Sequence, residues 1–182
     1  IIEASKILFN SSLTYGVISD IDGNNYKTIQ IGNQIWMGEN LKTKTFNNGS
    51  PIQLVTDNKD WYNMTTPAYC WLNNDESTYR NKYGALYNWN AVNTGKLCPG
   101  GWHVPAIEEW DALASYLIAN GFNHDGTTGE NKIAKSLASV KNWETSDEEG
   151  SPGNNPLLNN QSGFSALPAG FRDPTHGWNS FN

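Results

Sequence analysis

LCPGGWHVPAIEEW, residues 97–110, is the stretch of this sequence that says most about its fold. Gly100 and Gly101 follow a proline and let the backbone turn sharply before Trp102. Pro105 favours extended backbone in the residue before it and fits the first turn of a helix. The stretch therefore predicts a turn that leads directly into a helix, with Trp102 packed in the hydrophobic interior.

A helix is expected to follow this turn, over residues 107–120. Apolar residues recur there at spacings of three and four, which places them on one helical face. They are Ile107, Trp110, Leu113, Ala114, Leu117 and Ile118. Glu108 and Glu109 lie near the positive end of the helix dipole, and Asn120-Gly121 is a stop signal.

Weaker patterns predict the other elements. Two turn signals, at residues 22–25 and 32–33, separate segments of alternating polarity near the front of the chain. The predicted strands are 16–20, 26–31, 34–37, 67–72 and a buried one at 163–170, and the predicted helices are 83–92, with Leu86, Trp89 and Val92 on one face, and a short one within 131–139. Together these elements indicate a mixed α and β domain.

Length and composition are typical of a single exported binding domain. The chain has 182 residues, and only 37% of them are apolar. Because it contains 8 Trp, 8 Tyr and 6 Phe, aromatic rings are expected to supply much of the buried area. The net charge of -6 argues against a nucleic-acid partner, and no apolar run is long enough to span a bilayer. Ile1 is not a start methionine, so an export signal could precede it.

Four stretches in a fixed order resemble the Fibrobacter succinogenes major paralogous domain, a large family of exported bacterial proteins. They are DIDGNNYKTIQIGNQIWMGENLKT (20–43), PAYCWLNNDESTYRNKYGALYNWNAV (67–92), LCPGGWHVP followed by xxEW (97–110) and SGFSALPAGFR (162–172). The resemblance implies an α+β, C-type lectin-like fold, shared with the formylglycine-generating enzymes, with two main helices, short antiparallel sheets and long irregular loops. Ala106 departs from the family, which usually has a capping Ser, Thr or Asp there.

The resemblance also bears on domain organisation. Residues 16–182 are expected to form a single C-type lectin-like domain after an N-terminal tail or strand at residues 1–15. Family members usually continue past the GFR segment to a terminal strand that carries a cysteine, so either this domain lacks its final strands or the natural chain is longer. Cys98 then has three possibilities: a partner in such a strand, no partner, or a disulfide with Cys70 that closes a loop of roughly 29 residues and contributes about 3 kcal/mol.

Ligand-binding residues are expected in two places. Trp61 and Tyr62 lie in a polar, turn-rich region, where exposed rings can stack on the apolar face of a pyranose while amides and carboxylates bond its hydroxyls. Packing of both rings in the core is the favoured interpretation, and exposure is the alternative that would make them ligand-binding residues. The second place is the end of the chain, where the resemblance implies the entrance to the variable, outward-facing part of the fold. Its candidates are Arg172, Asp173, His176 and Trp178.

Two oxygen-rich turns have some features of cation sites. Asp20, Asp22 and Asn24 are spaced like the start of an EF-hand loop, but the later ligands, including the final Glu, are missing. Residues 73–76, Asn-Asn-Asp-Glu, are the best oxygen-rich candidate, although a surface turn has the same composition. Zinc is not supported, because no CxxC or His cluster accompanies the cysteines. No metal and no cofactor are therefore assigned.

No catalytic motif is recognised in the chain. GxSxG, HExxH and phosphate-binding loops are absent, and the solitary His103 fits a hydrogen-bonded structural role. The catalytic relatives use reactive cysteines late in the domain, where this chain has none. The calcium-site motifs of sugar lectins are absent too, but a fold can persist without its site. Glycoside hydrolysis by a carboxylate pair stays open.

The sequence therefore predicts a non-catalytic domain at the outer membrane surface or outside the cell. It would bind a glycan or protein ligand through its loops, as an adhesion or recognition module, with a lipid anchor outside this sequence as one route to the surface. Two alternatives remain: a carbohydrate-active or oxidative enzyme on the same fold, and a purely structural module of a longer adhesin.

Overall fold

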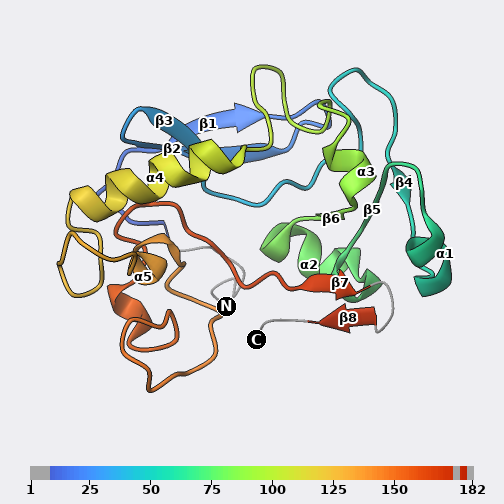
Figure 1. The fold of residues 1–182 in the computed structure, drawn as a ribbon. Coiled ribbons are helices and arrows are strands. Elements are labelled where there is room, and N and C mark those ends of the chain that lie inside the picture. Colours follow the sequence, from blue (N-terminus) through green and yellow to red (C-terminus); the bar gives the residue numbers. More distant parts are fainter. Residues whose placement is uncertain (1–8, 174–176, 180–182) are drawn as a thin grey trace.

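Three small β-sheets and five α-helices form the fold in the computed structural model, which describes residues 9–173 and 177–179 (Figure 1). The predicted α+β class is confirmed. Within these residues, no helix has the length and apolar character that a membrane crossing requires.

The first sheet confirms the three strands predicted at the front of the chain. β1 (Gly16–Ser19), β2 (Asn25–Ile31) and β3 (Gln34–Met37) pair antiparallel in the order β1-β2-β3. The turn between β1 and β2 is fixed by Asp20, whose carboxylate accepts from the Asn24 backbone N–H at 2.8 Å. Buried side chains of β2 and β3 then face α4 (Ile107–Ala119), which runs alongside this sheet in Figure 1.

The first hydrophobic core lies between this sheet and α4. Leu113 and Leu117 are 1% and 0% exposed, and they pack with a cluster made of Ile29, Ile31, Trp36 and Ile133. The Trp110 ring lies 4.7 Å from that of Trp36, although Trp110 is 40% exposed. The predicted apolar face is wrong at its first member, because Ile107 is 67% exposed and lies beyond the edge of the core.

A second core surrounds the second sheet. β4 (Gln53–Leu54), β5 (Ala68–Cys70) and β6 (Leu86–Tyr87) have the order β4-β5-β6, with β4 parallel and β6 antiparallel to β5. β5 confirms the predicted strand at 67–72 and is buried at every residue. The core side chains that surround the sheet are Phe46, Ile52, Tyr69, Trp71, Ala91 and Leu97.

The helix predicted at 83–92 is confirmed only over its last four residues and is wrong before them. The chain forms α2 (Glu76–Tyr83), then β6, then the single turn α3 (Trp89–Val92). Gly84 ends α2 with a positive φ of 70°, and a Cβ there would lie 2.6 Å from the Leu41 carbonyl oxygen. The polar turn predicted at 73–76 is a 3-10 turn, η1 (Leu72–Asn74), followed by Asp75, which caps α2.

The last third of the described chain is mostly irregular. It contains α5 (Ala134–Leu137), which confirms the short predicted helix, the 3-10 turn η2 (Pro156–Leu158), and the hairpin of β7 (Phe171–Asp173) and β8 (Gly177–Asn179). The buried strand predicted at 163–170 is wrong, because Gly163 and Ser165 have φ values of 81° and 63° that interrupt extended backbone. Only an isolated bridge from Ala166 to Ala138 remains.

The LCPGG turn does not insert its tryptophan into the interior. Leu97 belongs to the second core, whereas Trp102 is half-buried and belongs to neither core cluster. The prediction that Trp102 plugs the interior is therefore wrong. Glu109 holds the turn to the helix instead: its carboxylate accepts from the Ala106 backbone N–H at 2.9 Å and lies 2.8 Å from His103 Nε2. This bond caps α4 although Ala106 has no side-chain oxygen.

Acid should weaken the start of α4. The Ala106 N–H and then His103 hold the pKa of Glu109 below its ordinary value of 4.5. Because the pKa is lower in the folded protein, this carboxylate stabilises the fold above about pH 4.5 and loses that effect as the pH falls through the folded pKa. Between pH 5 and pH 3, the melting temperature of Glu109→Gln should therefore fall less than that of the unchanged protein. Glu108→Gln on the same turn is the control, and an equal fall for both variants would contradict this role of Glu109.

Candidate functional site

A groove between β4 and the short helix α1 (Asn58–Asn63) is the candidate site. Asp57 starts the helix, because its Oδ1 accepts from the backbone N–H groups of Lys59 at 2.8 Å and Asp60 at 3.0 Å. The groove has a volume of about 410 Å³. The residues that line it are Gln53, Leu54, Val55, Thr56, Asp57, Asp60, Asn63, Met64 and Thr65. They combine carboxylates, amides and hydroxyls with a few apolar side chains.

Arg172 fixes the wall of this groove from behind. It comes from β7 and is only 7% exposed. Its guanidinium donates to the carbonyl oxygens of Val55 and Thr56, both at 2.7 Å, and to Asn58 Oδ1 at 2.7 Å. The same group lies 4.8 Å from the centre of the Trp61 ring, close enough for a cation–π contact. Arg172 thus joins β7 to the segment that connects β4 with α1, and its part in the site is to position the groove.

The structure brings two of the six predicted ligand-binding residues, Trp61 and Arg172, into contact. Trp61 is half-buried with its ring against Arg172, whereas Tyr62, the next residue of α1, is 60% exposed. Asp173 is half-buried at the end of β7, and Trp178 pairs with Arg172 in the register of β7 and β8. His176 lies outside the described residues. Neither Trp61 nor Tyr62 is among the residues that line the groove, and Tyr62 is the exposed one of the two.

Trp89 is a further candidate that the sequence reasoning missed. The spacing of apolar residues places it on one helical face with Leu86 and Val92, and in the structure it is 71% exposed. Its neighbours Asn88 and Asn90 donate to the carbonyl oxygens of Thr66 at 2.8 Å and Met64 at 3.4 Å, which fixes α3 beside the end of the groove. A signal was present: Asn88 is a capping residue that accepts from the Ala91 N–H, so the helix begins only at Trp89.

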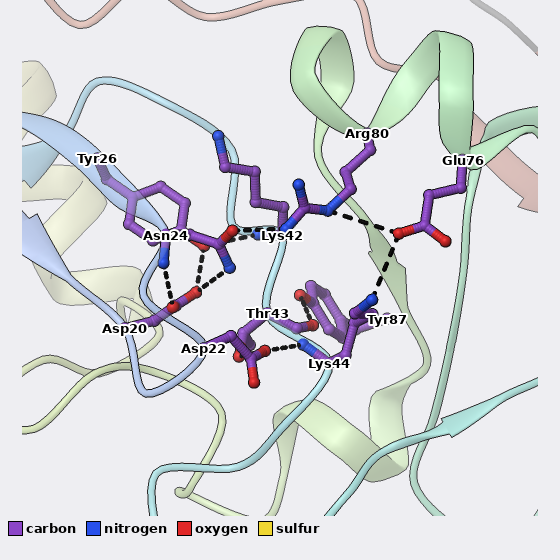
Figure 2. A network of polar contacts seen from close by, with 10 residues as sticks. All are labelled: Asp20, Asp22, Asn24, Tyr26, Lys42, Thr43, Lys44, Glu76, Arg80 and Tyr87. Atoms are coloured by element: carbon purple, nitrogen blue, oxygen red, sulfur yellow. Dashed lines mark hydrogen bonds and ion pairs between the residues drawn. The ribbon is translucent and has the colours of Figure 1, made fainter.

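The EF-hand-like turn at residues 20–24 is part of a network within the protein (Figure 2). Asp20 Oδ2 accepts from Tyr26 Oη at 2.5 Å and from Asn24 Nδ2 at 2.7 Å. Asp22 Oδ2 accepts from the Lys44 backbone N–H at 2.6 Å and from Thr43 Oγ1 at 2.9 Å. Burial, with Asp20 next, raises the pKa of the Tyr26 hydroxyl. Hydrogen-bond donors of the protein itself therefore bind the carboxylates of both Asp20 and Asp22.

The other half of this network reaches α2. Arg80 Nη2 donates to Asn24 Oδ1 at 2.5 Å, and Arg80 Nε lies 3.6 Å from Glu76 Oε1, as Figure 2 shows. Lys44 Nζ lies 3.5 Å from the same Glu76 oxygen. The network joins the first sheet to α2. No group of three or more His, Cys, Asp or Glu residues that could hold a metal occurs in the described part of the chain.

Cys70 and Cys98 are both unpaired, so the alternative in which they form a disulfide with each other is wrong. Cys70 is buried in β5, and burial raises the pKa of its thiol to about 11. Cys98 is half-buried beside a cavity of about 230 Å³, and burial raises the pKa of its thiol as well. Both thiols are held in their less reactive, protonated form at neutral pH.

The comparisons with known proteins identify one family. The family whose model matches the chain is described as Fibrobacter succinogenes major domain, and the match covers residues 29–182. No curated protein and no solved structure matches the chain.

Proposed function

The chain belongs to the Fibrobacter succinogenes major domain family, and from this premise we propose that it is an exported bacterial surface domain that binds a saccharide in the groove between β4 and α1. The proposal includes a C-type lectin-like fold, as the resemblance to that group implies. The observation that carries it is a polar groove lined in part by α1, the helix that carries the exposed Tyr62, with the exposed Trp89 on α3, a helix that contacts the groove residue Met64 through Asn90.

The chemistry of the groove suits a sugar. Asp60 and Asn63 line it, and Tyr62 lies between them on the same helix. Carboxylate and amide oxygens accept hydrogen bonds from sugar hydroxyls, while an exposed ring such as that of Tyr62 or Trp89 covers the C–H face of a pyranose. Because Arg172 fixes the backbone at Val55 and Thr56, a ligand would meet a wall that is already ordered, and less entropy would be lost on binding.

The geometry favours binding without turnover. A glycosidase needs two carboxyl groups on opposite sides of the scissile bond. Here both carboxylates of the groove belong to the start of one short helix, and Asp57 already accepts two backbone N–H groups there. The low charge content, the abundant aromatic residues and the exposure of Tyr62 and Trp89 support a recognition module outside the cell.

A glycan array, run with and without a chelator, tests this function. We expect binding to at least one glycan, and a loss of about five- to tenfold in affinity for Tyr62→Ala and for Trp89→Ala, since one stacked ring contributes about 1 kcal/mol. Tyr116→Ala is the matched control, because Tyr116 is a 41% exposed aromatic residue on α4. Melting temperatures of the two groove variants should stay unchanged.

Three results would contradict the proposal. The first is an array with no bound glycan, together with capture of a protein from a cell-surface preparation. The second is full glycan affinity in both the Tyr62 and the Trp89 variant. The third is turnover of a polysaccharide that is lost in Asp60→Asn, which would indicate an enzyme.

A further inference from the structure

The charges of the groove point to the class of saccharide that it takes, an inference that rests on the proposed function. Asp57 and Asp60 are the only charged residues in the lining that the structure describes. Both Asp57 bonds to the helix backbone use Oδ1, which holds that carboxylate in place. Asp60 makes no side-chain hydrogen bond or ion pair with any described residue, so its carboxylate faces solvent. A bound ligand would therefore meet two negative charges.

Basic residues nearby do not offset these charges inside the groove. Lys59 belongs to α1 but does not line the groove. Arg172 is 7% exposed, and its guanidinium donates to Val55, Thr56 and Asn58 behind the wall. The net charge of -6 adds a negative field over the whole surface. A carboxylate or sulfate on a ligand would thus be repelled, without an arginine or lysine to receive it.

We infer that the groove selects saccharides without acidic groups, neutral or amino-bearing, and that Asp60 is a residue that enforces this selection. Two like charges about 4 Å apart in water repel each other enough to weaken binding about fivefold. With two carboxylates in the lining, an acidic sugar should bind about tenfold or more weakly than its neutral counterpart at low salt. The difference should shrink as salt screens the charges.

Four probes of equal length test this selection: cellotetraose, the tetramer of N-acetylglucosamine, the tetramer of glucosamine, and tetraglucuronate, which is cellotetraose oxidised at every C6. Affinities are measured by titration calorimetry in 20 mM and 150 mM salt. We expect tetraglucuronate to bind the unchanged protein at least tenfold more weakly than the tightest of the other three probes. Asp60→Asn should reduce this gap, the ratio of the two dissociation constants, about fivefold in 20 mM salt. Asp147→Asn, which makes the same charge change at an exposed residue outside the groove lining, should leave the gap unchanged.

The outcomes separate this inference from the function on which it rests. If tetraglucuronate binds as tightly as the neutral probes, or if Asp60→Asn leaves the gap as it was, the selection is overturned while saccharide binding stands. If Asp147→Asn narrows the gap as much as Asp60→Asn does, the net charge of the protein and not the groove sets the preference, and the role of Asp60 is overturned. If none of the four probes binds and the array is also empty, the proposed function fails and this inference fails with it.

Discussion

Replacing Arg172 by methionine is expected to lower the free energy of unfolding by about 3 kcal/mol. The change leaves the carbonyl oxygens of Val55 and Thr56 without their guanidinium donor, and it removes the cation from the face of Trp61. Hydrogen bonds to a charged group contribute about 1.5–3 kcal/mol, and a buried acceptor that loses its partner adds to the cost. Methionine keeps most of the apolar stem, so the effect reports the lost polar contacts. Urea denaturation measures it.

Asn58→Ala is the matched control for the contacts that Arg172 makes with Val55 and Thr56. It removes one acceptor of Arg172 but keeps both carbonyl contacts, so we expect a loss of about 1 kcal/mol. The proposed saccharide binding should fall further in the Arg172 variant than in the Asn58 variant, although neither residue lines the groove. Equal loss of stability in the two variants would show that the carbonyl contacts of Arg172 do not hold the fold.

Leu117→Ala should lower the free energy of unfolding by about 2–5 kcal/mol, the range for a fully buried leucine that leaves a cavity. Leu117 is 0% exposed and packs in the first core between α4 and the first sheet. Ile107→Ala changes a residue of the same size on the same helix that is 67% exposed, and it should cost less than about 0.5 kcal/mol.

The comparison of these two variants tests the orientation of α4. Both residues lie on the apolar face that the sequence pattern predicts, so the pattern alone expects similar losses. Similar measured losses would show that the start of α4 packs as deeply as its centre. A large loss for Leu117 only would support the structure, in which the core begins after the first turn.

Local patterns predicted the elements that depend on local contacts. The strands β1, β2 and β3 follow from alternation and from turn residues at 22–25, and α4 follows from apolar spacing. The helix α2 escaped notice because its residues are mostly polar and it depends on the Asp75 cap, whose hydrogen bonds, led by Thr78, hold the pKa of that carboxyl at about 2. Its end depends on the approach of Gly84 to Leu41, a contact between distant parts of the chain.

The difference between local and distant contacts also explains which parts of the candidate site could be predicted. The polar, turn-rich surroundings of Tyr62 left exposure and core packing both open, with core packing favoured, and the structure shows Tyr62 exposed. The role of Arg172 could not be predicted, since its three acceptors lie in residues 55–58 and no pattern in the GFR segment points to them. The prediction for Trp102 was wrong. The turn at 97–101 predicted a buried ring, but Leu97 packs in the second core instead, and Glu109 holds the turn to α4.

The contacts of Arg172 with residues 55–58 also affect the order in which parts of the protein can fold. The Arg172 guanidinium binds the Thr56 carbonyl across 116 positions of the chain. Contacts of such long separation form slowly, and during synthesis residue 172 leaves the ribosome well after α1. The nascent chain can therefore form the first sheet and α4 while the recognition surface is still incomplete. The proposed saccharide binding should therefore be the last property that a growing or refolding chain acquires, later than most of its secondary structure.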